Sequence, residues 1–153
     1  MANKTSGYII DEAQITDAPR LAVLCTQLGY PASEENVIRR LEDLRGNEER
    51  VTYVARTHQG QVIGWIGAFI RYILTADKHV QLSGLVVDEA HRGRNVGEQL
   101  VEAVEGWAVE QGCETIYVRS NATRVRAHHF YIRLGYQQIK SSLTFEKSLS
   151  QRD

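Results

Sequence analysis

The sequence predicts an α+β fold, in which helices pack around a mixed β-sheet. Apolar residues recur at helical spacing over residues 16–45, whereas from Val51 to Val87 they form the short, β-branched runs that are typical of strands. A helical pattern then returns, with one more strand-like segment inside it. No internal repeat, low-complexity tract or Pro/Gly/Ser-rich linker interrupts this order. We therefore expect a single domain over residues 1–153.

The first half begins with a short strand at residues 8–10, and two helices follow it. Thr16 can cap the first helix, which ends at Gly29. Ser33 starts the second helix, because two glutamates that complement a helix N-terminus come directly after it, and Gly46 ends that helix.

After Gly46 the spacing of apolar residues changes from a helical to a strand-like period, and this change predicts the later elements. We expect strands at residues 51–56, 62–70 and 80–87, a helix at 96–111, a strand at 115–119, a helix at 125–134 that Gly135 closes, and two short final strands up to Leu149. The strand at 80–87 ends in a continuous apolar run, as expected of a strand that is buried on both faces.

Composition excludes several classes of protein. The chain has 42% hydrophobic and 24% charged residues, which is ordinary globular usage, and a net charge of −1 gives no general attraction to nucleic acid or to an anionic membrane. The longest apolar run, Val62–Ile70, is far shorter than the roughly 20 residues that span a bilayer. The N-terminus lacks the apolar core of a signal peptide, so we expect a cytoplasmic protein.

Cys25 and Cys113 lack CxxC spacing, and we expect free thiols.

The densest chemistry lies between Val87 and Leu100, where a buried strand passes through a polar loop into a helix. The first amides of a helix have no internal partner and favour an anion. Two glycines let the backbone approach a ligand, an asparagine tolerates a left-handed conformation, and two arginines add charged donors. These residues are Arg92, Gly93, Arg94, Asn95 and Gly97. The pattern suits a pyrophosphate, and a tight turn with solvated arginines is the alternative.

Two other phosphate-binding loops do not fit this segment. A P-loop ends in Gly-Lys-Ser/Thr, but here Gly97 is followed by Glu98-Gln99. A dinucleotide-binding loop starts with Gly-x-Gly near a first βαβ unit, but this loop lies past the middle of the chain.

The segment resembles motif A of the GCN5-related N-acetyltransferase superfamily, which reads Arg/Gln-x-x-Gly-x-Gly/Ala after an apolar strand end. The motif lies on Arg92-Gly93-Arg94-Asn95-Val96-Gly97, with Asn95 where the family usually has glycine. The run from Ala127 to Tyr136 is similar to the family's Ala-x-x-x-Tyr-x-x-x-Gly-Phe/Tyr helix end. The family often has asparagine three residues before that alanine; here the residue is Arg124, and Asn121 can supply the amide instead.

The resemblance implies a single-domain acyl-CoA N-acyltransferase fold, with a mixed, mostly antiparallel sheet and helices on both faces. It implies acetyl-CoA as the cosubstrate, held by the half of the chain at about residues 79–149. The pantetheine arm would lie between two splayed strands and pair with the backbone, while the pyrophosphate would sit on the loop amides. The implied cofactor-binding residues are Leu85, Val86, Val87, Arg92, Gly93, Arg94, Asn95, Val96, Gly97 and Asn121. Gly84 is compatible with the bulge that opens such a splay, or with a packing requirement.

The family's usual reaction is direct attack of a neutral amine on the thioester within a ternary complex. A backbone N–H near Val87 would hold the oxyanion. Tyr131 stands where the family has its general acid; the alternative is a half-buried aromatic of an amphipathic helix. The general base is open among Ser83, His79, Glu98 and water. We expect no metal, because His128 and His129 lack the spacing of a metal pair.

The sequence leaves the acceptor open. In the resembled family the helices at about residues 16–45 shape the acceptor pocket, so Tyr30, Glu34 and Glu35 are candidates to line it, although the two glutamates also complement a helix end. A small-molecule amine is the acceptor we expect. A protein lysine, a protein N-terminus or a non-catalytic acyl-CoA-binding module are the alternatives. We expect no nucleic-acid or membrane partner, and a homodimer remains open.

Overall fold

The computed structural model describes residues 7–150. The chain divides into two compact units between Arg119 and Ser120, and each is described in its own frame. The first contains β1 (Tyr8–Glu12), η1 (Ile15–Asp17), α1 (Ala18–Leu28), α2 (Glu34–Leu44), β2 (Arg50–Thr57), β3 (Val62–Ile73), β4 (Ala76–Val87), η2 (Glu89–His91), α3 (Val96–Glu110) and β5 (Ile116–Val118). The second contains α4 (Val125–Arg133).

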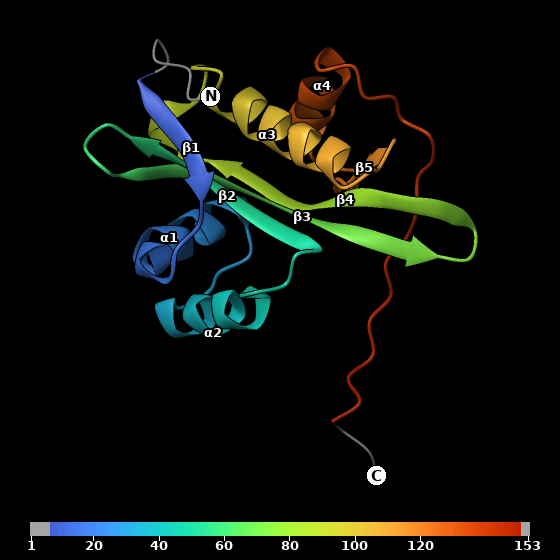
Figure 1. Ribbon diagram of the computed structural model, residues 1–153, viewed down its shortest axis with the longest axis horizontal. Helices are drawn as coiled ribbons and strands as arrows, with labels where there is room; N and C mark the ends of the chain where they lie inside the picture. Colours follow the sequence, from blue (N-terminus) through green and yellow to red (C-terminus); the bar gives the residue numbers. More distant parts are fainter. Residues whose placement is uncertain (1–6, 151–153) are drawn as a thin grey trace. The chain divides into compact units, whose positions relative to one another are not determined.

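The five strands form one sheet in the order β1-β2-β3-β4-β5 (Figure 1). The first four strands pair antiparallel, and β5 pairs parallel with β4. The sheet is therefore mixed and mostly antiparallel, which confirms the expected fold class. Among the described residues, no helix combines the length and the apolar character needed to cross a membrane.

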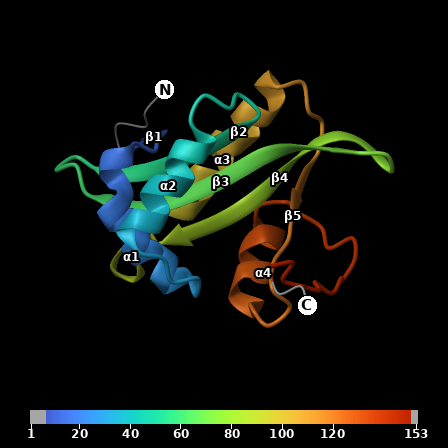
Figure 2. The ribbon, with the colours of Figure 1, turned by 90° about the horizontal axis from the view of Figure 1, so that it is seen from below.

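Helices cover both faces of this sheet, as expected. In Figure 2, α1 and α2 lie in front of the strands and α3 lies behind them. The sheet register places Val54, Trp65 and Val86 in one row, and all three pack in the core that α1 and α2 cover. On the other face Gly64 lies beside the α3 residue Leu100, because a Cβ at Gly64 would come within 3.3 Å of its Cδ1. These two packed layers bury the apolar periodicity of the sequence.

Local signals define most helix ends, with one correction. Ser33 caps α2, because its Oγ accepts a hydrogen bond of 3.1 Å from the backbone N–H of Asn36, and Gly29 closes α1 at a φ of 100°. Thr16 does not cap α1. It lies inside the 3-10 turn η1, and Asp17 occupies the N-cap position. The Asp17 carboxylate accepts the backbone N–H of Gln14 at 2.8 Å. This bond closes the turn that contains Thr16, so Asp17 is the residue that precedes α1.

Two strand expectations also need correction. The hairpin of β3 and β4 is longer than expected, because both strands continue past Ile70 and before Val80 (Figure 1). The two short strands expected up to Leu149 are absent from the structure, in which residues 137–150 form no strand. Alternating apolar residues there satisfy the pattern of a strand, but a strand also requires a backbone partner, which the local sequence cannot supply.

A buried ion pair joins the start of α1 to the sheet. Arg56 on β2 donates to both carboxylate oxygens of Asp17, at 2.7 and 2.9 Å, and also to Asp11 at 3.1 Å. Burial alone would raise the pKa of Asp17, but the hydrogen bonds from Arg56 and Gln14 and the charge of Arg56 outweigh it and lower that pKa. Because the folded state favours the ionised carboxylate, this pair stabilises the fold above the ordinary aspartate pKa and loses its effect as the pH falls through the lowered value.

We predict that Asp17→Asn lowers the free energy of unfolding at pH 7 by about 2 kcal/mol, less than for a fully buried pair because Arg56 keeps some contact with water. Wild-type stability should fall as the pH drops below about 4, whereas the variant should show a flatter acid limb. Urea unfolding between pH 7 and pH 3 measures both effects. Parallel pH curves for the two proteins would show that Asp17 does not carry this dependence.

Candidate functional site

The sheet opens between β4 and β5. Parallel pairing joins Val80–Leu82 to Ile116–Val118, and it stops there. In the part of the chain that the structure describes, no other strand pairs with this side of β4 beyond Leu82. The last residues of β4 therefore present backbone donors and acceptors along a free edge, which an extended ligand can use as it would a strand.

A β-bulge marks the point where the edge becomes free. Gly67 pairs with Gly84 and Ala68 pairs with Leu82, so Ser83 is an extra residue without a cross-strand partner. A Cβ at Gly84 would lie 2.6 Å from the ring of Trp65, which requires a glycine here for packing as well. Both readings of Gly84 are thus confirmed by the structure.

The register settles which backbone groups face the free edge. Asp88 donates its backbone N–H to the carbonyl of Ile63 at 2.7 Å, so Asp88 and, two residues earlier, Val86 direct their backbone groups toward β3. The groups of Leu85 and Val87 therefore point the other way, to the open side of β4. Of the three expected backbone contacts, two face the opening, and Val86 belongs to the β3 ladder.

The loop after β4 exposes its backbone at the start of α3. Gly93 and Asn95 adopt left-handed conformations, with φ of 82° and 63°, as the sequence predicted for the asparagine. Residues 92–95 are exposed, whereas Val96 is buried and anchors the helix. The first bond of the helix runs from the N–H of Gln99 to the carbonyl of Asn95, at 3.1 Å, and the side chain of Asn95 makes no capping bond. The amides of the first turn, including that of Gly97, are left for an anion.

Tyr8 contacts this loop through its hydroxyl group. Its hydroxyl donates to the carbonyl of Arg94 at 3.4 Å, from a side chain that is buried. Burial, and then the nearby carboxylates of Glu98 and Glu102, raise the pKa of Tyr8, so the phenol keeps its proton. Glu98, one of the candidate bases, therefore lies in the first turn of α3 beside Tyr8.

The other candidate bases lie apart from this loop. His79 is 1% exposed and its Nδ1 lies 2.9 Å from the carbonyl of Asp77. Val87 is eight residues further along the strand, roughly 26 Å away at about 3.3 Å per residue. Ser83 is exposed at the bulge. The structure does not bring these side chains together.

Sequence reasoning missed the side chains that hold the end of β4. Arg20 and Gln27 on α1 both bind the carboxylate of Asp88, the residue directly after Val87. These contacts span 68 and 61 residues of sequence, so no local spacing could indicate them. The only available signal was an acidic residue at the point where an apolar strand ends.

The second unit carries Tyr131 on α4. Tyr131 stacks edge to face with Phe130 and with Tyr136, at ring-centroid distances of 5.1 and 5.8 Å. Burial raises the pKa of Tyr131 to about 12, against an opposing effect of the Arg124 charge. Gly135, with φ of 97°, closes the helix as expected. The hydroxyl therefore remains protonated throughout the neutral range.

Asn121 lies in the same unit, in the turn before α4. Its Oδ1 accepts the backbone N–H of Thr123 at 3.0 Å and the hydroxyl of Thr123 at 2.8 Å. Its backbone carbonyl accepts the Nε2 proton of His128 at 2.9 Å. Among the residues described, no group of three or more His, Cys, Asp or Glu side chains is placed to hold a metal ion.

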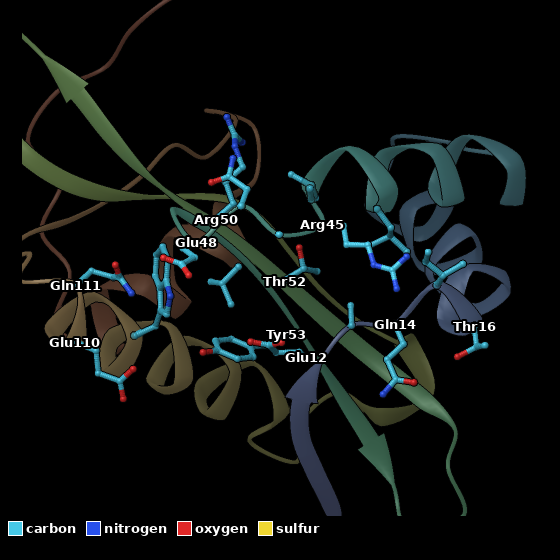
Figure 3. Close-up of a pocket in the computed structure, with 18 residues that line it drawn as sticks. Glu12, Gln14, Thr16, Arg45, Glu48, Arg50, Thr52, Tyr53, Glu110 and Gln111 are labelled. Atoms are coloured by element: carbon cyan, nitrogen blue, oxygen red, sulfur yellow. The ribbon is translucent and has the colours of Figure 1, made fainter.

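A cavity of about 870 Å³ lies at a different place in the first unit (Figure 3). Figure 3 shows Glu110 and Gln111, from the end of α3, on one side of it and Arg45, after α2, on the other. Burial, followed by the charges of Glu12 and Glu110, raises the pKa of Tyr53 in its wall. Because α3 runs from Val96 to Glu110, about 21 Å at 1.5 Å per residue, this cavity is remote from the loop at residues 92–97.

Comparison with known proteins shows the family to which the chain belongs. Residues 17–136 match the model of the acetyltransferase (GNAT) family. The chain belongs to this family. The match extends across the boundary between the two units, from residue 17 to residue 136.

Individual GNAT relatives agree with that assignment. The aminoalkylphosphonate N-acetyltransferase of Salmonella typhimurium is 30% identical over 128 residues, covering 83% of this chain and 79% of the relative. The crystal structure of the aminoglycoside 6'-N-acetyltransferase AAC(6')-Ih from Acinetobacter baumannii has a TM-score of 0.81 at 22% identity, covering 94% of this chain and 99% of that one.

AAC(6')-Iy, in complex with the bisubstrate analog CoA-S-monomethyl-acetylneamine, has a TM-score of 0.80 at 21% identity, and the match covers 92% and 98% of the two chains. The family assignment makes this GNAT protein an N-acetyltransferase whose cosubstrate is acetyl-CoA.

Proposed function

We propose that this GNAT enzyme transfers acetyl from acetyl-CoA to the amine of a small molecule, by direct attack within a ternary complex. The observation that carries the proposal is the free edge of β4, which leads directly into the exposed N-terminus of α3. An extended pantetheine arm and a pyrophosphate need these two features at this spacing, one after the other.

In this proposal the backbone of Leu85 and Val87 pairs with the pantetheine arm at the free edge. The pyrophosphate binds the amides of residues 93–97, and Arg92 and Arg94 supply charged donors from the exposed loop. The N–H of Val87 points to the same side and stabilises the oxyanion that forms when the amine attacks the thioester. Asn121 is the remaining candidate contact to acetyl-CoA.

Tyr131 is the proposed general acid for the departing thiolate. Its raised pKa, about 12, supports the role, because an acid must hold its proton until the thiolate leaves. No side chain is assigned as the base. The attacking amine then loses its proton to water, so the rate should follow the neutral fraction of the amine.

The comparisons support a small acceptor. The named relatives act on an aminoalkylphosphonate and on aminoglycosides, which are small amines of different charge. Tyr30 is 65% exposed, and Glu34 and Glu35 are exposed in the first turn of α2. These three side chains can meet a cationic acceptor, while the two glutamates also complement the helix N-terminus.

An acceptor screen tests the proposal. Release of free CoA thiol is followed with aminoalkylphosphonates, aminoglycosides, polyamines, lysine-containing peptides and peptides with free N-termini. Turnover with a small amine supports the proposal. Turnover with peptides alone would establish a protein acetyltransferase. Binding of acetyl-CoA without turnover on any class would indicate a non-catalytic acyl-CoA-binding protein.

We predict that Gly97→Val and Arg92→Ala both weaken acetyl-CoA binding. The valine should block close approach of the ligand to the first turn of α3, and the loss of Arg92 should remove a charged hydrogen bond of about 1.5–3 kcal/mol. Titration calorimetry with acetyl-CoA measures both effects, and circular dichroism checks the fold. Unchanged affinity in both variants would show that this loop does not bind the pyrophosphate.

We predict that Tyr131→Phe lowers kcat about 10²–10⁴-fold, the usual range for one positioned acid, with little change in acetyl-CoA affinity. The ring contacts with Phe130 and Tyr136 remain, so stability should hardly change. Because the phenol has a pKa of about 12, wild-type turnover should not fall between pH 8 and 10 through its ionisation. Tyr136→Phe, which removes a neighbouring hydroxyl, is the matched control. Equal turnover of Tyr131→Phe and wild type would show that Tyr131 is not the general acid and that water protonates the thiolate instead.

A further inference from the structure

Two side chains of α1 hold the residue at which β4 ends. Gln27 donates from Nε2 to Oδ1 of Asp88 at 3.1 Å, and Arg20 donates to Oδ2 of the same carboxylate at 3.3 Å. Arg20 also donates from Nε to the carbonyl of Val62 on β3, at 3.0 Å. The Asp88 side chain is 15% exposed, so both of its oxygens are satisfied largely away from water.

Gln27 also fixes the first turn of the loop. Its Oε1 accepts the backbone N–H of Glu89, at 3.1 Å, while its Nε2 binds Asp88. An α1 side chain thus caps η2 from 62 residues away in sequence. The free N–H of a 3-10 turn needs such a partner, so η2 depends on α1 for its position.

The groups around Asp88 favour its ionised carboxylate over the neutral acid. Burial alone would raise the pKa of Asp88, but hydrogen bonds from Gln27, Ala90 and His91 and the charge of Arg20 lower it. His91, with Nδ1 3.3 Å from Oδ2, adds a contact from the far end of η2. The carboxylate therefore connects α1, η2 and, through Arg20, the start of β3.

We propose that Asp88, held by Arg20 and Gln27, is a positioning residue that sets the affinity of this enzyme for acetyl-CoA. The inference rests on the proposed acetyl-CoA contacts at Val87 and residues 92–97. Asp88 lies between these two groups of contacts, one residue after the free strand edge and four residues before Arg92. Since β4 is held by the sheet and the loop is exposed, the angle at which the chain leaves Val87 is determined at Asp88.

The test compares Asp88→Asn with a control variant that weakens another carboxylate–guanidinium pair of the fold. Asp88→Asn keeps the shape but removes the charge that aligns Arg20 and Gln27. Arg56→Lys weakens the guanidinium–carboxylate pair with Asp17, which also pins α1 but does not touch the loop after β4. Unfolding temperature and coenzyme A affinity are measured for both variants, at a temperature where both are folded.

We expect Asp88→Asn to weaken coenzyme A binding about tenfold, as for the loss of a hydrogen-bonded charge. Arg56→Lys should melt at a lower temperature with wild-type affinity. Gln27→Leu, which removes the η2 cap and keeps the side-chain volume, should weaken affinity in the same direction as Asp88→Asn. Unchanged affinity in Asp88→Asn and Gln27→Leu would overturn the proposal. So would an equal loss of affinity in Arg56→Lys, because general loosening would then explain the effect.

A double variant tests whether Arg20 acts through Asp88. If the two form one unit, Arg20→Gln combined with Asp88→Asn should lose no more affinity than Asp88→Asn alone. Additive losses would contradict the unit. Coenzyme A binding requires no acceptor, so the failure of every amine in the screen would overturn the proposed function while this measurement could still succeed or fail independently.

Discussion

The structure depends on one constraint, which is that β4 loses its neighbour after Leu82. Backbone N–H and C=O groups along a strand need partners, and an unpartnered strand edge is normally covered or blunted. Here the edge at Leu85 and Val87 stays free among the described residues, at the place where an apolar strand would otherwise favour further pairing. An enzyme that binds an extended cosubstrate can use that edge, because the ligand supplies the missing partner.

Several other features serve to keep this edge in place. The bulge at Ser83 interrupts the ladder between β3 and β4, and the absence of a side chain at Gly84 lets the ring of Trp65 pack against the strand from the α1 and α2 side. Val96 anchors α3, so that the exposed loop has a fixed point at its far end. Asp88 provides the fixed point at its near end. The loop proposed to bind the pyrophosphate thus has an exposed backbone and is held at both ends.

The features that sequence reasoning predicted are those with a local cause. Ser33 and Gly29 define helix ends by capping and by backbone conformation, and Asn95 adopts the left-handed conformation expected of an asparagine in that loop. The motif at residues 92–97 also depends on adjacent residues. Its family could therefore be recognised from the sequence alone.

The features that escaped prediction have partners far away in the chain. The binding of Asp88 by Arg20 joins residues 68 positions apart, and the 3-10 turn before α1 is shaped by Arg56 on β2. Thr16 had the right chemistry for a cap, but the more strongly bound Asp17 took the position. In residues 137–150 an alternating pattern was not enough, because strand formation depends on a neighbouring backbone.

The extra residue at Ser83 also bears on how the sequence of this enzyme can change over evolutionary time. Side chains of a strand alternate between faces, so one inserted residue reverses the assignment of every position beyond it. Leu82 faces the α3 side with Ala68, whereas Gly84 and Val86 face the α1 and α2 side with Trp65. Deleting Ser83 would make Leu82 and Gly84 neighbours in sequence, and alternation would keep them on the opposite faces that they occupy now, with the pairs Ala68–Leu82 and Gly67–Gly84 retained. Lineages can therefore lose this residue without turning the end of β4 over, but they would lose with it the irregularity in the β3–β4 ladder next to the point where β5 stops pairing.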